Sequence, residues 1–147
     1  MVRQMLCGFV LLFCVLSQTA KATIVDTQNV FDLALIGDGM FAVRDPQGKV
    51  TYTRDGAFKP RYDQFLVQKS TGLVLLDNAG HPIKLLCDEP KVLGYRIDDD
   101  GSITAIMDDG KVKLVAYVGV SDRDGVIVER GLSQIWTIRS SSLEISH

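Results

Sequence analysis

Short runs of strand-forming residues separated by aspartate–glycine turns constrain the fold of this chain most strongly. Asp-Gly pairs occur at residues 38–39, 55–56, 100–101, 109–110 and 124–125. Glycine adopts the positive φ that tight turns need, and an aspartate side chain accepts hydrogen bonds from its own turn. No long stretch keeps the period of about 3.6 residues that marks an amphipathic helix. The sequence therefore predicts an all-β fold, as a compact antiparallel sandwich or a barrel-like domain.

The apolar runs between these turns predict individual strands. Three hairpins are expected, which pair residues 40–44 with 50–54, residues 65–68 with 73–76, and residues 91–97 with 102–106. Residues 111–120 form the clearest single strand, because apolar residues recur there at every second position and share one face. They are Val112, Leu114, Ala116, Val118 and Val120. The strand before Gly37-Asp38-Gly39 is expected to enter a tight hairpin.

The first 22 residues have the layout of a secretory signal peptide. Arg3 gives a basic start, residues 5–16 are apolar, and Ala20-Lys21-Ala22 is a small-x-small cleavage pattern. The apolar run is shorter than the roughly 20 residues that cross a bilayer, which disfavours an uncleaved anchor. We therefore expect cleavage after Ala22, a mature chain without a transmembrane span, and a location in the periplasm or beyond the outer membrane.

The remaining chain divides into three parts. Residues 23–30 are a polar lead-in, residues 31–137 are the β domain, and residues 138–147 are a polar, serine-rich tail that is expected to be loosely held. Cys87 is the one cysteine left after cleavage, so it is either a buried small hydrophobe or an intermolecular bridge. Trp136, the single tryptophan, is expected in the core or in a lid.

The composition argues against nucleic-acid binding and against several kinds of catalytic and metal-binding site. The formal net charge of the 147 residues is -2, which disfavours nucleic-acid binding. Two histidines leave little room for a catalytic or metal-binding histidine cluster. Residues 98–101 (Asp-Asp-Asp-Gly) lack the ligand spacing of a calcium loop and fit a solvated hairpin turn better. A small hydrolase that uses two carboxylate side chains is an alternative, but nothing in the sequence singles out such a pair. We predict no enzyme activity, no catalytic residues, no cofactor and no metal site.

The order of several motifs resembles that of bacterial flagellar hook and basal-body rod proteins. Residues 31–43 resemble the family's opening signature, and residues 52–58 resemble its Tyr-Thr-Arg-x-Gly-x-Phe signature. Weaker likenesses follow at residues 65–67, 100–103 and 126–137. The motif residues, expected to be scaffold positions, are Phe31, Asp32, Leu33, Gly37, Gly39, Phe41, Tyr52, Thr53, Arg54, Gly56 and Phe58.

The resemblance implies the β-rich middle domain through which hook and rod subunits pack laterally. Met40 replaces a usual phenylalanine, and Gln64 replaces a usual turn glycine. The long terminal helices of the family are not matched, so self-association would come from the β domain, as a homo-oligomer or a ring templated by a partner. The resemblance implies a structural component of the flagellar basal body that packs against rod, hook or ring proteins. The alternative is a stand-alone envelope module that binds a glycan or a peptide.

We expect the exported protein to begin at Thr23. Intact-mass measurement of material purified from the cell envelope checks this, because removal of residues 1–22 changes the mass by a known amount. A mass that retains these residues would contradict cleavage.

Overall fold

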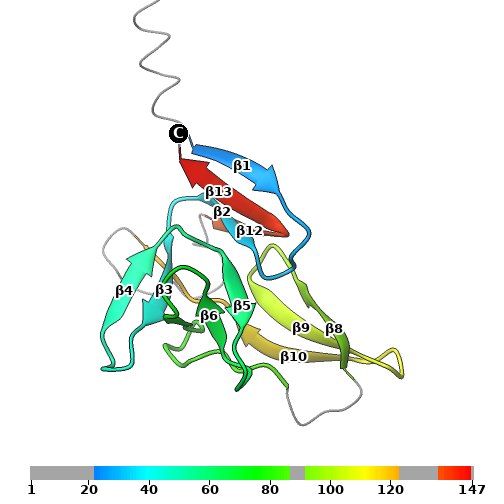
Figure 1. Ribbon diagram of the computed structural model, residues 1–147. Helices are drawn as coiled ribbons and strands as arrows, with labels where there is room; N and C mark the ends of the chain where they lie inside the picture. Colours follow the sequence, from blue (N-terminus) through cyan, green and yellow to red (C-terminus); the bar gives the residue numbers. More distant parts are fainter. Residues whose placement is uncertain (1–21, 87–91, 123–135, 147) are drawn as a thin grey trace, which may run out of the picture.

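The structure, a computed structural model, describes residues 22–86, 92–122 and 136–146, and every regular element in these ranges is a β-strand (Figure 1). The all-β prediction is therefore confirmed for this part of the chain. The predictions for the signal peptide up to residue 21, for Cys87, for the turn at residues 124–125 and for residues 126–135 of the closing motif lie outside the described residues. Within the described ranges, no helix has the length and apolarity needed to cross a membrane.

The strands are short, and their bounds follow the turn residues. They are β1 (Ala22–Asp26), β2 (Leu33–Gly37), β3 (Met40–Arg44), β4 (Val50–Thr53), β5 (Phe58–Pro60), β6 (Leu66–Gln68), β7 (Val74–Leu75), β8 (Val92–Ile97), β9 (Ser102–Met107), β10 (Val112–Tyr117), β11 (Val120–Ser121), β12 (Trp136–Ser140) and β13 (Ser142–Ser146).

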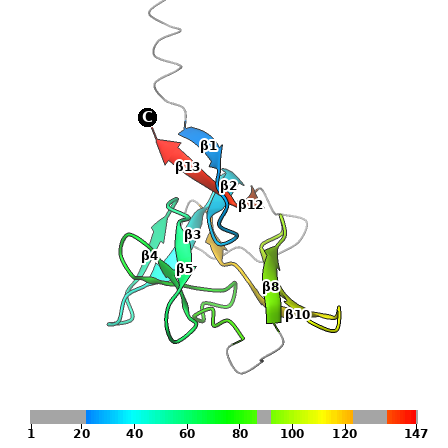
Figure 2. The same cartoon turned by 45° about the vertical axis from the view of Figure 1, so that its right-hand side comes forward.

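The strands form several antiparallel sheets, none of which closes into a barrel. The largest has the order β11-β3-β7-β6-β5, with β4 also paired to β3, and a three-stranded sheet has the order β10-β9-β8. Two ribbons, β12-β2 and β1-β13, complete the fold. The β1-β13 ribbon stands at one end of the molecule in both views (Figures 1 and 2).

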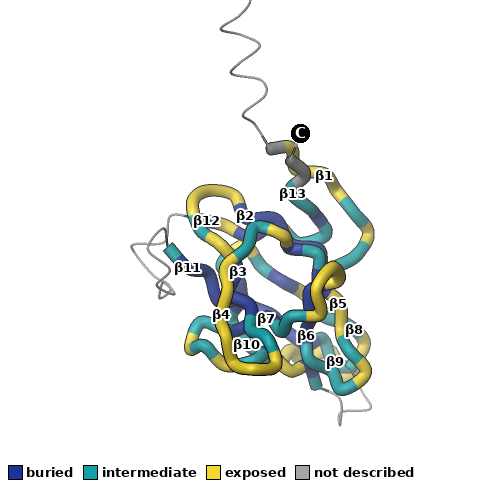
Figure 3. The backbone as a smooth tube through the Cα atoms, turned by 60° about the vertical axis from the view of Figure 1, so that its left-hand side comes forward, coloured by how far each residue is buried: buried dark blue, intermediate teal, exposed yellow. Residues whose placement is uncertain are grey.

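The core lies where the sheets meet. Segments of β2 and β11 are buried, whereas β4 is exposed from Val50 to Tyr52 and half-buried at Thr53 (Figure 3). The rings of Phe41 and Phe58 are both fully buried and pack edge to face with centroids 5.4 Å apart. Trp136 is buried against this core, which confirms the expectation of a core residue. Because the apolar side chains come from strands far apart in the chain, no single sheet is expected to be stable alone.

The three expected hairpins are present. Residues 41–44 pair with residues 50–53, Val67 pairs with Val74, and residues 92–97 pair with residues 103–107. In the turn between β3 and β4, the Gly48 amide donates to the Asp45 carbonyl at 3.0 Å. In the turn between β8 and β9, the Gly101 amide donates to the Asp98 carbonyl at 3.0 Å. The acidic residues 98–101 therefore make a hairpin turn, as the sequence predicts.

The segment Gly37-Asp38-Gly39 is not the tight hairpin that the sequence suggests. It connects β2, which pairs with β12, to β3, which pairs with β4, β7 and β11, so the two strands it joins belong to different sheets. Gly37 and Gly39 have φ of 105° and 139°. These positive values turn the chain out of one sheet and into the next, which local sequence cannot distinguish from a hairpin.

The expected single strand over residues 111–120 is also wrong. It divides into β10 and β11, and β10 has a register shift between Leu114, opposite Thr104, and Ala116, opposite Ile103. Because neighbouring residues of a strand point to opposite faces, the extra residue moves Ala116 to the face opposite Leu114. Val112 and Leu114 are consequently 57% and 51% exposed, whereas Val118 is buried.

The expectation of a loosely held end is wrong for residues 139–146. Strand β12 pairs along β2 from Trp136 to Ser140, and β13 pairs along β1 from Ser142 to Ser146. The serine-rich composition concealed an alternating pattern in which Trp136 and Ile138 are buried. The lead-in likewise supplies β1. The division of the chain into domains stays a prediction.

Replacement of Gly39 by valine should destabilise the fold. A Cβ at this position would lie 2.7 Å from Val120 Cγ1 and 3.1 Å from the Ser121 carbonyl oxygen, in addition to the strain of a φ of 139°. We expect Gly39→Val to lower the free energy of unfolding by about 1–3 kcal/mol, measured by urea denaturation. Gly48→Val is the control, since Gly48 also has positive φ but has open space around it. Equal losses in both variants would contradict the steric argument.

Candidate functional site

The two family-like motifs of the sequence lie against each other. The Leu33 amide donates to the Gly56 carbonyl at 2.8 Å, and the Phe58 amide donates to the Phe31 carbonyl at 3.2 Å. Asp32 forms a β-bridge with Ala57. The backbones of the two motifs are thus hydrogen-bonded to each other, and the motif residues form one continuous part of the fold.

Arg54 is the centre of this arrangement. Its Nη1 donates to the carbonyl oxygens of Gly37 at 2.8 Å and Gly39 at 2.9 Å, and its Nη2 donates to the Leu35 carbonyl at 2.9 Å. Its Nε donates to Glu144 Oε2 at 2.7 Å. A guanidinium is a planar group with five N–H donors, so one side chain can hold several acceptors in fixed directions. Arg54 therefore fixes the turn between β2 and β3.

Glu144 links this turn to the terminal ribbon. It lies on β13, and its side chain is 16% exposed against 32% for Arg54. A partly buried charged hydrogen bond is stronger than the same contact on an open surface. Sequence reasoning missed Glu144, because its strand was expected to be a loose tail, and the two residues are separated by 90 positions.

Gly56 is required by close backbone contact rather than by its own φ. A Cβ built on it would lie 1.7 Å from the Leu33 carbonyl oxygen and 3.0 Å from Phe41 Cε2. No side chain fits at this distance. The glycine of the second motif therefore permits the contact between the two motifs.

Asp32 is a buried carboxylate with a full set of partners. Its Oδ2 accepts a hydrogen bond from Thr27 Oγ1 at 2.8 Å, and its Oδ1 accepts from Lys69 Nζ at 3.0 Å and from Asn29 Nδ2 at 3.4 Å. A buried charge is tolerated when it is paired and hydrogen-bonded in this way. Asp32 thus joins the lead-in segment to the loop after β6, which the sequence does not reveal.

The other motif residues divide into buried and exposed groups. Leu33, Phe41 and Phe58 are fully buried, and the Phe31 ring packs against Tyr95 with centroids 5.8 Å apart. Thr53 Oγ1 accepts a hydrogen bond from the Asp55 amide at 3.0 Å. Tyr52, which the sequence predicts to be a scaffold position, lies on β4 and is 38% exposed.

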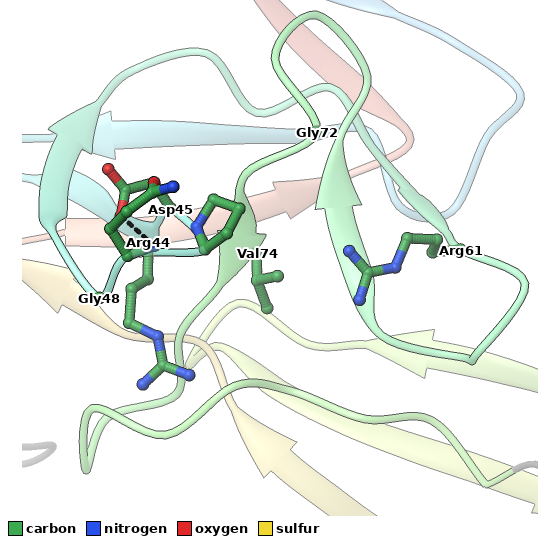
Figure 4. Close-up of a pocket in the computed structure, with 8 residues that line it drawn as sticks. Arg44, Asp45, Gly48, Arg61, Gly72 and Val74 are labelled. Carbon is green, nitrogen blue, oxygen red and sulfur yellow. Dashed lines mark hydrogen bonds between the residues drawn. The ribbon is translucent and has the colours of Figure 1, made fainter.

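The described residues offer little for catalysis or metal binding. They include no group of three or more histidine, cysteine, aspartate or glutamate side chains that could hold a metal ion. A hollow of about 240 Å³ lies beside the Arg54 turn, lined by Asp38, Gly39, Met40, Arg54 and Asp122. A second hollow of about 340 Å³ lies between the β3–β4 turn and the loops around β5 to β7, as Figure 4 shows.

Arg61 and Asp63 form an ion pair beside the larger hollow, and the pKa values of both groups are shifted. The Arg61 guanidinium donates to the Asp63 carboxylate through Nε at 2.8 Å and Nη2 at 2.7 Å. This hydrogen bond lowers the pKa of Asp63 and raises the pKa of Arg61. The pair contributes to stability above the ordinary pKa of an aspartate, and this contribution is lost as the pH falls through the lowered value.

The comparison with known families agrees with this geometry. The family model described as the flagellar hook protein FlgE/F/G D1 domain matches residues 34–114, which is more than half of the chain. The chain belongs to the flagellar hook protein FlgE/F/G D1 domain family. A search of curated proteins found no match. The resemblance to hook and rod proteins is therefore confirmed for the middle of the chain.

The residues matched by the D1 domain family include Arg54 and Gly56, whereas Asp32 and Glu144 lie outside the matched range. Gln64, which stands where the hook and rod family usually has glycine, has a φ of 72° in this D1 domain. Its amide donates to the Arg61 carbonyl at 2.8 Å, which closes the turn despite the side chain. The turn conformation is thus kept at the cost of backbone strain.

Loss of the Arg54 side chain should destabilise the D1 domain. Arg54→Ala leaves three carbonyl oxygens and Glu144 without their donor, so we expect a loss of about 2–3 kcal/mol in the free energy of unfolding, measured by urea denaturation. Arg54→Lys should recover only part of it, because an ammonium lacks the planar fork.

The matched control is Arg96→Ala. Arg96 pairs with Asp98 at 3.2 Å on the surface, and such pairs contribute at most about 1 kcal/mol. If Arg54→Ala and Arg96→Ala unfold at the same urea concentration, Arg54 does not have the central role described above.

Proposed function

We propose that this protein is a non-enzymatic structural component of the bacterial flagellar hook and basal-body apparatus. It enters the periplasm through its signal peptide, folds as a β domain and packs against rod, hook or ring proteins. The observation that carries the proposal is membership of the FlgE/F/G D1 domain family, over residues 34–114. Proteins of the flagellar hook use this domain in a structural assembly, and the same use is the simplest for this chain.

The chemistry of the motif residues supports a scaffold role. The charged groups Arg54 and Asp32 are engaged in hydrogen bonds to the fold itself. Gly56 serves a backbone contact, and the motif phenylalanines are buried. A reactive group would need a free face toward a substrate, so the arrangement favours packing over catalysis.

The exposed apolar residues give such a protein surfaces for association. Tyr62 is 93% exposed and Leu93 is 72% exposed, and Val112 and Leu114 are exposed on the edge strand β10. Exposed apolar side chains and open sheet edges are common means of adding protein partners. We place the contacts with flagellar partners on these surfaces.

Affinity purification from motile cells tests the proposal. A tagged copy, expressed from its own locus after mild cross-linking, should co-purify rod, hook or ring proteins. A strain that lacks the basal body is the control, since it should lose these partners while the tagged protein keeps its amount and its location in the envelope. Recovery of envelope glycan or unrelated peptides in both strains, without flagellar proteins, would favour the stand-alone binding module instead.

A further inference from the structure

Two hairpin turns of the three-stranded sheet share the same local sequence and the same local structure. The β8–β9 turn ends in Asp99-Asp100-Gly101, and the β9–β10 turn ends in Asp108-Asp109-Gly110. In each turn the glycine amide donates to the carbonyl three residues earlier, at 3.0 Å and 3.1 Å respectively. In each turn the carboxylate of the second aspartate accepts from the amide two residues later at 2.9 Å. The two glycines have φ of 85° and 83°, so neither local sequence nor local geometry distinguishes these Asp-Gly bonds.

Tertiary contacts hold the β8–β9 turn in place. Gly101 is buried, and a Cβ built on it would lie 3.3 Å from Trp136 Cη2. The Gly101 carbonyl accepts from the Val118 amide at 2.8 Å, and the Asp99 carbonyl accepts from the Ile138 amide at 2.9 Å. This turn therefore cannot change its conformation without breaking contacts to β12 and to the segment after β10.

The β9–β10 turn is free of such contacts. Asp108, Asp109 and Gly110 are exposed, and the turn projects from the body of the molecule (Figures 1 and 2). Among the described residues, a Cβ built on Gly110 would meet no atom within 4 Å apart from its chain neighbours. Exposed loop tips with few packing contacts open locally at low cost, without unfolding of the core.

The other Asp-Gly pairs in the described ranges are also held by the fold. The Gly56 carbonyl accepts from the Leu33 amide at 2.8 Å, and a Cβ built on Gly56 would lie 1.7 Å from the Leu33 carbonyl oxygen. The Gly39 carbonyl accepts from Arg54 Nη1 at 2.9 Å. Of the four Asp-Gly pairs that the structure describes, only Asp109-Gly110 has an exposed glycine.

We propose that Asp109 is a site of spontaneous conversion to isoaspartate in the folded protein. The Gly110 nitrogen attacks Cγ of the protonated Asp109 carboxyl group, a C–N bond forms, and the amide proton and the carboxyl hydroxyl leave as water. Water then opens the five-membered succinimide. Cleavage between this nitrogen and the main-chain carbonyl carbon of Asp109 leaves the chain running through Cγ, whereas cleavage at Cγ restores aspartate. Water is the only co-reactant, and the mass of the protein does not change.

The packing of each turn decides whether this ring can close. The Asp109 carboxylate must first release the Lys111 amide, and the Gly110 amide must release the Met107 carbonyl. Both bonds lie within the exposed turn, so their opening disturbs no other element. Isoaspartate adds one carbon to the main chain between β9 and β10, which loosens the turn end of the edge strand β10. The inference goes beyond the proposed function, since it depends only on the turns of this chain.

Peptide mapping after prolonged incubation of the purified protein at neutral pH tests the proposal. Trypsin cleaves after Arg96 and Lys111, so one peptide, residues 97–111, contains both turns and each serves as the reference for the other. Fragmentation by electron transfer distinguishes isoaspartate from aspartate at each position. In the folded protein we expect isoaspartate to form at least about tenfold faster at residue 109 than at residue 100, which corresponds to about 1.4 kcal/mol. In guanidinium chloride the two rates should become alike, because the tripeptides are identical.

Two variants provide a matched comparison. Asp109→Glu should abolish the reaction at residue 109, because the longer side chain would have to close a six-membered ring. Asp108→Glu keeps the Asp109-Gly110 bond and should react as the unmodified protein does. Circular dichroism establishes that both variants are folded. Equal rates at residues 100 and 109 in the folded protein, or no isoaspartate at residue 109 in the folded protein, would overturn the proposal.

Discussion

The fold depends on one guanidinium group that collects acceptors from three places in the chain. Arg54 holds carbonyl oxygens on both sides of the turn between β2 and β3, and it binds Glu144 on the last strand. A turn between two sheets has carbonyl groups that no strand can satisfy, and buried acceptors without donors are costly. A single side chain supplies the donors, so the two sheets can meet at a fixed angle without a longer connection.

The close contact at Gly56 and the buried Asp32 depend on the same geometry. The Gly56 carbonyl accepts from Leu33, two residues before the first carbonyl bound by Arg54. Asp32, beside it, is held by Lys69 and Thr27. These polar contacts surround a core of buried aromatic and aliphatic side chains. Because Arg54 and Asp32 each bind several partners, the loss of either side chain should affect more of the fold than the loss of an isolated surface pair would.

Much of this arrangement could be predicted from the sequence, because turns and alternation are local signals. The hairpin around Asp45-Pro46-Gln47-Gly48 is an example, since its residues determine both the turn and the register. The sequence predicts a hairpin at Gly37-Asp38-Gly39, but the segment connects two sheets. Both kinds of turn need glycines with positive φ, so local sequence does not separate them. The bulge in β10 and the Glu144 partner depend on contacts that are distant in the sequence. Local patterns carry no information about such contacts.

The pairing of β1 with β13 has a mechanical consequence. Ala22 lies opposite Ser146, so both ends of the described chain leave the domain at the same point, and the strands run antiparallel from there. A force that pulls these ends apart would break the backbone hydrogen bonds one pair after another, beginning at the outer end. Separation of the two strands would break the Arg54–Glu144 contact before it disturbed the packing of the core. The ribbon therefore acts as a weak element that yields under tension while the rest of the domain stays folded.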